Sequence, residues 1–222
     1  MINFLDKPSF KIFNNPKFLK NKMRFTVLKN LIDFPEERQT FSYDCGAKCI
    51  QLILIYYGFD IPETDIIKIT KTDKSGTSVS RLKKVAKKFN LKIKSEKMSQ
   101  DDLKKYIDKK IPVIIAIQAW PKRPCHLNKS WKHGHYVIPI GYDEKRFYFE
   151  DPAAVLRTYL TFKELNERWH DMGHDKKKVQ NLGIVIYGTK PVFRNNKAIH
   201  MDNDAYKKVN GFLKIKKYKR IR

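Results

Sequence analysis

QTFSYDCG, residues Gln39 to Gly46, leads directly into an apolar run that extends from Cys45 to Tyr57 and stops at Gly58. This run predicts a buried helix, because glycine is favoured just past helix ends. Cys45 would lie at the N-terminus of that helix, where free backbone amides and the helix dipole favour a thiolate over a thiol. The stretch therefore predicts a reactive cysteine on a helix of the core.

Two short motifs far downstream supply the other groups that a reactive thiol needs. Gly134-His135-Tyr136-Val137 opens one β-like segment, and Glu150-Asp151-Pro152 ends another. In acyl transfer a thiol attacks, an imidazole takes its proton, a carboxylate orients the imidazole and an amide donor binds the developing oxyanion. We expect one residue of each kind to converge in a single site. The four residues are Gln39, Cys45, His135 and Asp151.

The order Gln, Cys, His, Asp and the residues around each position resemble the C39 peptidases. These are papain-like domains that cut leader peptides after a double glycine and are often fused to ABC exporters. The resemblance runs from about Gln39 to Gly188. It implies Gln39 in the oxyanion hole, Cys45 as nucleophile, His135 as base and Asp151 as its partner, with a peptide or protein substrate and no cofactor. The chain departs from the pattern because it lacks an exporter membrane segment and carries basic extensions.

Small residues beside the thiol and the imidazole predict a narrow cleft. Gly46 follows Cys45, and Gly134 precedes His135, so a substrate backbone has room to come close. We place Asp44, Gly46 and Gly134 in the substrate-binding surface. A narrow cleft agrees with the preference for Gly-Gly or Gly-Ala that the family resemblance implies.

The order of helical and β-like patterns predicts an α+β fold with a helical half packed against an antiparallel sheet, which is also the papain-like layout. Helices are predicted over Cys45–Tyr57, from Pro62, over Leu82–Phe89, from Ser99 and over Thr161–Trp169, where Thr161 and Glu164 have the spacing of a reciprocal cap. Strands are predicted over Leu91–Ser95, Val113–Gln118, His135–Gly141, Arg146–Phe149 and Leu182–Tyr187.

The length and the apolar content suit one domain with extensions. The chain has 222 residues, of which 41% are hydrophobic. We divide it into an N-terminal arm over residues 1–33, with a short strand at Phe25–Leu28, a C39-like domain over residues 34–190 and a basic C-terminal extension over residues 191–222. Charge and proline interrupt the N-terminal stretch Met1–Pro8 before an apolar core of signal-peptide length develops, and no later apolar run is long enough to span a bilayer.

The net charge is strongly positive. Lys and Arg total 47 against 23 Asp and Glu, which gives a formal net charge of +24. A chain of this kind favours anionic partners, such as nucleic acid, an acidic membrane surface or an acidic substrate. The lysines are scattered rather than gathered in a base-reading motif, so they are weak support for a specific nucleic-acid site.

Three cysteines are too few for a disulfide framework, and a reducing, cytoplasmic compartment fits best. Cys49 follows Cys45 by one helical turn and is expected in the core. Cys125 lies in a loop rich in Pro and Lys and is a weaker second candidate for the nucleophile.

The histidines and carboxylates near the two motifs leave alternatives open. His133 is the main rival of His135 as the base, whereas Glu150 and Asp143 are less suitable orienting carboxylates than Asp151. A metal site is not expected, although His126, His133 and His135 cluster and His170 and His174 are four residues apart.

Two other functions use the same residues differently. An amine or a thiol in place of water would make the site an acyl or peptidyl transferase, similar to phytochelatin synthase. Alternatively, a papain-like scaffold could present its basic surface to an anionic partner without catalysis.

Overall fold

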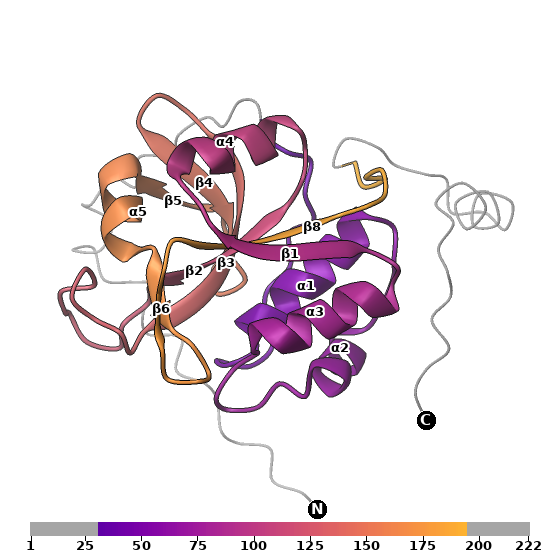
Figure 1. Ribbon diagram of the computed structural model, residues 1–222, viewed down its shortest axis with the longest axis horizontal. Helices are drawn as coiled ribbons and strands as arrows, with labels where there is room; N and C mark the ends of the chain where they lie inside the picture. The colour runs from indigo at the N-terminus through magenta and orange to yellow at the C-terminus, as the bar shows by residue number, and fades with distance from the viewer. Residues whose placement is uncertain (1–30, 195–222) are drawn as a thin grey trace, which may run out of the picture.

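The computed structural model describes residues 31–194 (Figure 1), so the predicted strand Phe25–Leu28 and the chain after residue 194 lie outside the described residues. Residues 31–194 form five helices and eight strands. The helices are α1 (Cys45–Tyr56), α2 (Glu63–Thr70), α3 (Val79–Lys88), α4 (Gln100–Asp108) and α5 (Phe162–Arg168). The strands are β1 (Lys92–Lys97), β2 (Val113–Gln118), β3 (Gly134–Tyr142), β4 (Arg146–Glu150), β5 (Thr158–Thr161), β6 (His170–Met172), β7 (Lys178–Gln180) and β8 (Leu182–Tyr187).

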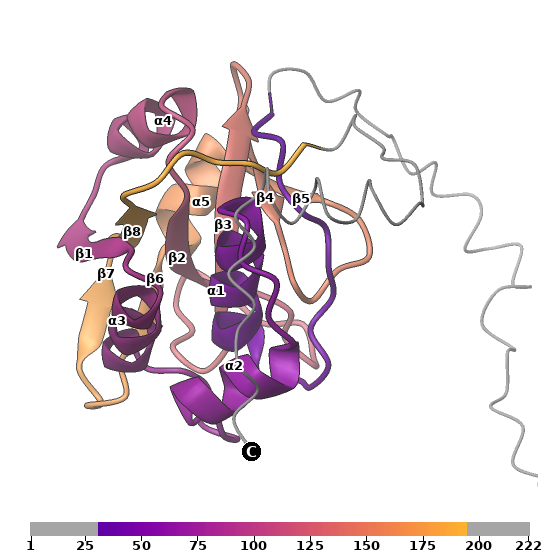
Figure 2. The same cartoon turned by 90° about the vertical axis from the view of Figure 1, so that its right-hand side faces the viewer.

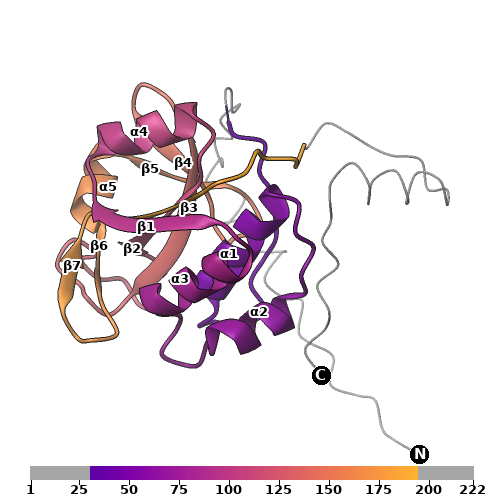
Figure 3. The same ribbon diagram turned by 45° about the vertical axis from the view of Figure 1, so that its right-hand side comes forward.

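An antiparallel sheet of six strands has the order β1-β8-β2-β3-β4-β5. Strand β2 is buried at every residue, with β8 and β3 on either side of it. β6 and β7 form a separate two-stranded hairpin, which contacts β2 and lies apart from α2 (Figure 3). The α+β class predicted from the sequence is confirmed.

Helices α1, α2 and α3 pack together beside this sheet, with α1 on β3 and α3 on β1 (Figure 2). The apolar run that predicted α1 is buried almost all round, because the sheet, the other two helices and the segment around Phe34 cover it. The ring of Phe34 lies 4.9 Å from the ring of Tyr56 near the end of α1. Helix α3 buries the predicted stripe of Leu82, Val85 and Ala86. The helical group thus fixes α1 against the sheet.

The predicted helix ends are formed by the expected residues. Gly58 has a φ of 88° just after α1, a conformation that favours glycine. Thr161 and Glu164 form a reciprocal cap on α5, as their spacing predicts. Ser99 forms the same motif with Asp102 at the start of α4.

Three strands were not predicted, whereas the predicted strand Leu91–Ser95 and the predicted helix Thr161–Trp169 are present as β1 and α5. β5, β6 and β7 have only three or four residues each, too few to show a clear alternation. β1 comes from the helical half of the chain but joins the sheet beside β8. Helix α5 follows the strands β2 to β5 rather than preceding them.

Both ends of the described chain contact the core. Ile32 is 4% exposed, and its backbone amide donates to the carbonyl of Ile140 in β3. The backbone amides of Val192 and Phe193 donate to the carbonyl of Tyr56 at the end of α1. No helix within residues 31–194 has both the length and the apolar character needed to cross a bilayer.

Candidate active site

Helix α1 places Cys45 at its first position. Asp44 is the N-cap, and its side chain makes no capping hydrogen bond, which leaves the first amides of the helix uncapped. One turn further on, the buried Cys49 thiol donates to the carbonyl of Tyr136 in β3 at 3.4 Å. The first turns of α1 therefore lie against the start of β3, where His135 is located.

His135 and Asp151 meet because β3 and β4 are antiparallel neighbours. His135 is the second residue of β3, and Asp151 directly follows the last residue of β4. Antiparallel pairing places the start of one strand beside the end of the other. His135 Nε2 lies 2.7 Å from Asp151 Oδ1, and both side chains are buried. The imidazole and the carboxylate proposed from the sequence are thus in contact.

Three further groups hold the Asp151 carboxylate. The amide of Ala153 donates to Oδ1 at 2.9 Å, while Trp120 Nε1 and Thr158 Oγ1 donate to Oδ2 at 3.1 and 3.2 Å. Burial alone would raise the pKa of Asp151. The hydrogen bonds from His135, Ala153 and Trp120 and the positive charge of His135 outweigh burial, so the pKa lies below its usual value. Asp151 is therefore an ionised partner for His135. Sequence reasoning missed Trp120 and Thr158, which lie near strand ends and carry no motif.

The surroundings of His135 favour its charged form. Burial lowers the pKa of the imidazole, but hydrogen bonds to Asp151 and Cys45, together with their negative charge, raise it to about 9. Because Nε2 is used by Asp151, Nδ1 is the ring nitrogen left for the thiol. The contact with Asp151 and the raised pKa favour an imidazolium at His135.

Gln39 is tied to both sides of this site. Its backbone amide donates to the carbonyl of Pro152, next to Asp151, at 2.8 Å. Its side-chain Nε2 donates to the carbonyl of Phe41 at 2.5 Å in the loop before α1. A primary amide has two N–H groups, so one remains for an oxyanion. Gln39 Oε1 is buried without a hydrogen-bond partner among the described residues.

Asp44 and Gly46 pack against neighbouring residues around the start of α1, and their assignment to the substrate-binding surface stays a prediction. Asp44 is fully buried and accepts a hydrogen bond from the amide of Phe41, so it supports the loop before α1. Burial raises its pKa, and the nearby Glu63 raises it further. Gly46 lies behind Cys45, where a Cβ atom would be 2.8 Å from Thr77 and 3.0 Å from Tyr136. Its small size is required by packing.

A buried lysine that the sequence did not reveal as special holds the same loop. Lys48 Nζ lies 3.1 Å from Glu37 in the loop and 3.1 Å from Glu63 in α2, and its side chain is 4% exposed. A buried ammonium is tolerated only when carboxylates compensate it. Lys48 therefore links the helix that carries Cys45 to the loop that carries Gln39. In the sequence it was one of many lysines.

A cavity of about 370 Å³ opens beside Cys45 and Gly134. Gly134 is exposed there, and its role in substrate binding stays a prediction. The connection between α2 and α3 supplies one wall through residues 74–77. Tyr136 and Asp171 line it from β3 and β6.

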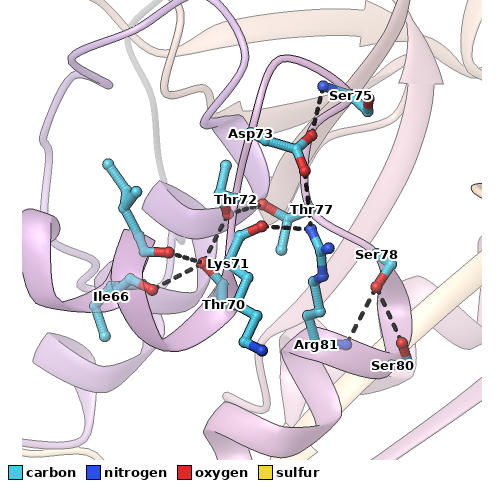
Figure 4. A network of polar contacts seen from close by, with 11 residues as sticks. Ile66, Thr70, Lys71, Thr72, Asp73, Ser75, Thr77, Ser78, Ser80 and Arg81 are labelled. Carbon is cyan, nitrogen blue, oxygen red and sulfur yellow. Dashed lines mark hydrogen bonds and ion pairs between the residues drawn. The ribbon is translucent and has the colours of Figure 1, made fainter.

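Hydrogen bonds stiffen the wall formed by residues 74–77 (Figure 4). The hydroxyls of Thr72 and Thr77 are 2.6 Å apart, and the amide of Ser75 donates to Asp73 at 2.8 Å. Arg81 of α3 donates to the carbonyl of Lys71 and lies 3.6 Å from Asp73. This wall is therefore preorganised on two helices.

The rival residues lie in other surroundings. His133 precedes β3, and its amide donates to Gln118 Oε1. Glu150 is buried 3.8 Å from Arg157, and burial raises its pKa to about 8 despite that cation. Asp143 accepts bonds from the amides of a turn. Cys125 is exposed in a loop, whereas Cys49 is buried, as the sequence predicts.

The remaining histidines do not gather. His170 lies in β6, and its Nε2–H donates to the carbonyl oxygen of Ser130 at 2.7 Å. His174 is exposed in the turn after β6. Among residues 31–194, no three His, Cys, Asp or Glu side chains are arranged to hold a metal ion.

Known proteins share this sequence pattern. The family model of the Peptidase C39 family matches residues 33–173. The pediocin PA-1 transport/processing ATP-binding protein PedD of Pediococcus acidilactici is 30% identical over 115 residues, which are 52% of this chain and 14% of that protein. The lactococcin-G-processing and transport ATP-binding protein LagD of Lactococcus lactis subsp. lactis is 26% identical over 126 residues, 57% of this chain and 16% of that protein. The chain thus spans about one sixth of these relatives.

Solved structures share the fold. A double glycine motif protease from an AMS/PCAT transporter, in complex with the leader peptide, matches 73% of this chain and 97% of its own at a TM-score of 0.54 and 20% identity. A putative C39-like peptidase from Bacillus anthracis matches 75% and 98% at a TM-score of 0.53 and 15% identity. The family model covers more than half of the chain, and these folds agree with it. The chain belongs to the Peptidase C39 family.

Proposed function

We propose that this chain is a cysteine peptidase that hydrolyses peptide bonds with Cys45, His135 and Asp151, and with Gln39 in the oxyanion hole. The observation that carries the proposal is the 2.7 Å contact between His135 Nε2 and Asp151 Oδ1. Cys45, at the first position of α1, is among the groups that raise the pKa of the same imidazole. The cavity beside Cys45 supplies room for a substrate.

The proposed reaction begins with a Cys45 thiolate and a His135 imidazolium. The thiolate attacks the carbonyl carbon of the scissile amide, and the free N–H of Gln39 and the Cys45 backbone amide bind the oxyanion. His135 then protonates the leaving amine, which departs and leaves a thioester. Water attacks the thioester, His135 takes the proton, and the acid and the thiol are released. Asp151 keeps the imidazole oriented throughout.

The proposed substrate is a peptide or protein cut after small residues such as Gly-Gly, in a reducing compartment such as the cytoplasm. The support is the family and the names of two relatives. One is named for processing and transport of lactococcin G, and the other for transport and processing of pediocin PA-1. One solved relative is described as a double glycine motif protease bound to a leader peptide. Gly134 is exposed at the edge of the cavity, next to His135.

Internally quenched peptides with a Gly-Gly centre test the proposal. We expect wild-type protein to cleave them after the second glycine, and Cys45→Ala to abolish cleavage. Gln39→Ala should retain the thiol but lower turnover by about 10²–10³-fold, the usual effect of losing one oxyanion donor. Mass spectrometry of the products is the readout.

The same experiment separates the two alternative functions. Product carrying an added amine or thiol in place of water would indicate a transferase. Absence of any Cys45-dependent product, together with salt-sensitive binding of an anionic partner that survives Cys45→Ser, would replace the peptidase with a binding module.

A further inference from the structure

Asp171 is a carboxylate in the candidate cavity that the proposed mechanism does not use. It lies in the middle of β6 and lines the cavity together with Cys45. A Cβ atom on Gly134 would lie 2.2 Å from Asp171 Oδ1 and 2.6 Å from Oδ2. The carboxylate therefore rests against the backbone one residue before His135.

Only Oδ1 of this carboxylate is hydrogen-bonded to described residues of the protein. Oδ1 accepts the amide of Met172 at 2.8 Å and Gln118 Nε2 at 3.2 Å, which fixes the orientation of the group. Within residues 31–194, Oδ2 makes no hydrogen bond or ion pair with another residue. Burial raises the pKa of Asp171, although Met172, Gln118 and two histidines oppose this. A partly desolvated anion of this kind gains from a cationic partner.

The cavity around Asp171 suits a long side chain with a charged end. Its apolar walls include the ring of Trp131 and the side chains of Val179 and Leu182. Lysine and arginine bury their methylene chains along such surfaces and direct the charge to a polar group.

Other charges at the cavity lie at its solvent side. Lys74, Lys132 and His174 are exposed. Water and salt screen the electrostatic effect of these exposed cations over short distances. The half-buried carboxylate of Asp171 is screened less. Asp171 is thus a recessed negative group inside a positively charged rim.

We propose that Asp171 forms a subsite that binds a cationic side chain, lysine or arginine, of the peptide substrate within about three residues of the scissile bond. The distance follows from the contact of Asp171 with Gly134, next to His135, and from the reach of about 3.3–3.6 Å for each residue of an extended peptide. This subsite deepens the proposed peptidase function and rests on it.

Peptide binding to a Cys45→Ala protein tests the subsite without requiring cleavage. Acetylated fluorescent peptides with a Gly-Gly centre would carry one lysine, moved from the third residue before the bond to the third residue after it. A matched series would carry norleucine, which has a similar chain without the charge. Fluorescence anisotropy gives the dissociation constant of each peptide.

We expect lysine to bind about 10-fold more tightly than norleucine at one position, the factor typical of one charge-assisted hydrogen bond. Adding Asp171→Asn should remove this advantage and leave norleucine binding unchanged. Asp175→Asn, which removes an exposed carboxylate from the turn after β6, is the matched control and should retain the advantage.

Equal binding of lysine and norleucine peptides at every position, or absence of measurable binding, would overturn the subsite, and so would a lysine advantage that persists in Asp171→Asn. The comparison in the Asp171-containing protein does not depend on how the variant folds. If lysine peptides bind more tightly than norleucine peptides but the wild-type protein cleaves none of them, the proposed peptidase function is wrong. The subsite for a cationic side chain then still stands.

Discussion

The bond between His135 and Asp151 determines the pH range of the site. His135 has a pKa raised to about 9, and Asp151 contributes both a hydrogen bond and a negative charge to this shift. We predict that kcat/KM falls as the pH rises through about 9, because the imidazolium that protonates the leaving amine is lost. In Asp151→Asn this fall should move to lower pH. The measurement is kcat/KM for a quenched Gly-Gly peptide against pH.

Asp175→Asn removes a carboxylate outside the site and should keep the wild-type pH profile. An unchanged profile in Asp151→Asn would contradict the assignment of the carboxylate.

The raised pKa of His135 also affects the stability of the fold. The folded pKa of His135 lies above its usual value of 6.5, so protonation stabilises the fold fully below about pH 6.5. This contribution is lost as the pH rises through about 9.

Residue types and local motifs were sufficient to propose Gln39, Cys45, His135 and Asp151 from the sequence. Each step of acyl transfer needs a different chemical group, and few residues of each kind stood in a suitable context. Trp120 could not be found in this way, because it lies just after the end of β2 in no recognisable motif and its indole meets Asp151 only in the folded chain. Asp171 was missed because β6, the strand that carries it, has only three residues and shows no recognisable pattern in the sequence.

The connection between α2 and α3 forms one wall of the cavity beside Cys45. Arg81 holds it through the carbonyl of Lys71 and through Asp73, and residues 74–77 line the cavity. We predict that Arg81→Ala raises KM several-fold with little change in kcat, because the wall becomes mobile while Cys45 and His135 stay in place. Steady-state kinetics with the Gly-Gly peptide provide the measurement.

Lys84→Ala on the same helix removes an exposed charge and should leave KM unchanged. The alkylation rate of Cys45 by iodoacetamide should be the same in all three proteins. A fall in kcat and in alkylation together would indicate instead that the connection supports the catalytic residues.

Elements with strong local signals were predicted well. α1 has a long apolar run, and Thr161 with Glu164 forms the predicted cap of α5. The pairing of β1 with β8 could not be predicted, because it joins residues about 90 positions apart and no local pattern encodes it. The sheet that carries His135 therefore depends on contacts that only the folded chain makes.

At the scale of the whole molecule, the sequence places the domain at residues 34–190. The N-terminal limit of this range can be tested. Ile32 is 4% exposed, and its amide donates to Ile140 in the strand that carries His135. We predict that Ile32→Ala lowers the free energy of unfolding by about 2–5 kcal/mol, as expected for a buried isoleucine. Urea denaturation measures the change. Val155→Ala, at a side chain 75% exposed, should stay within about 0.5 kcal/mol. If both variants are equally stable, the domain begins after Ile32; a loss confined to Ile32→Ala extends the domain to include it.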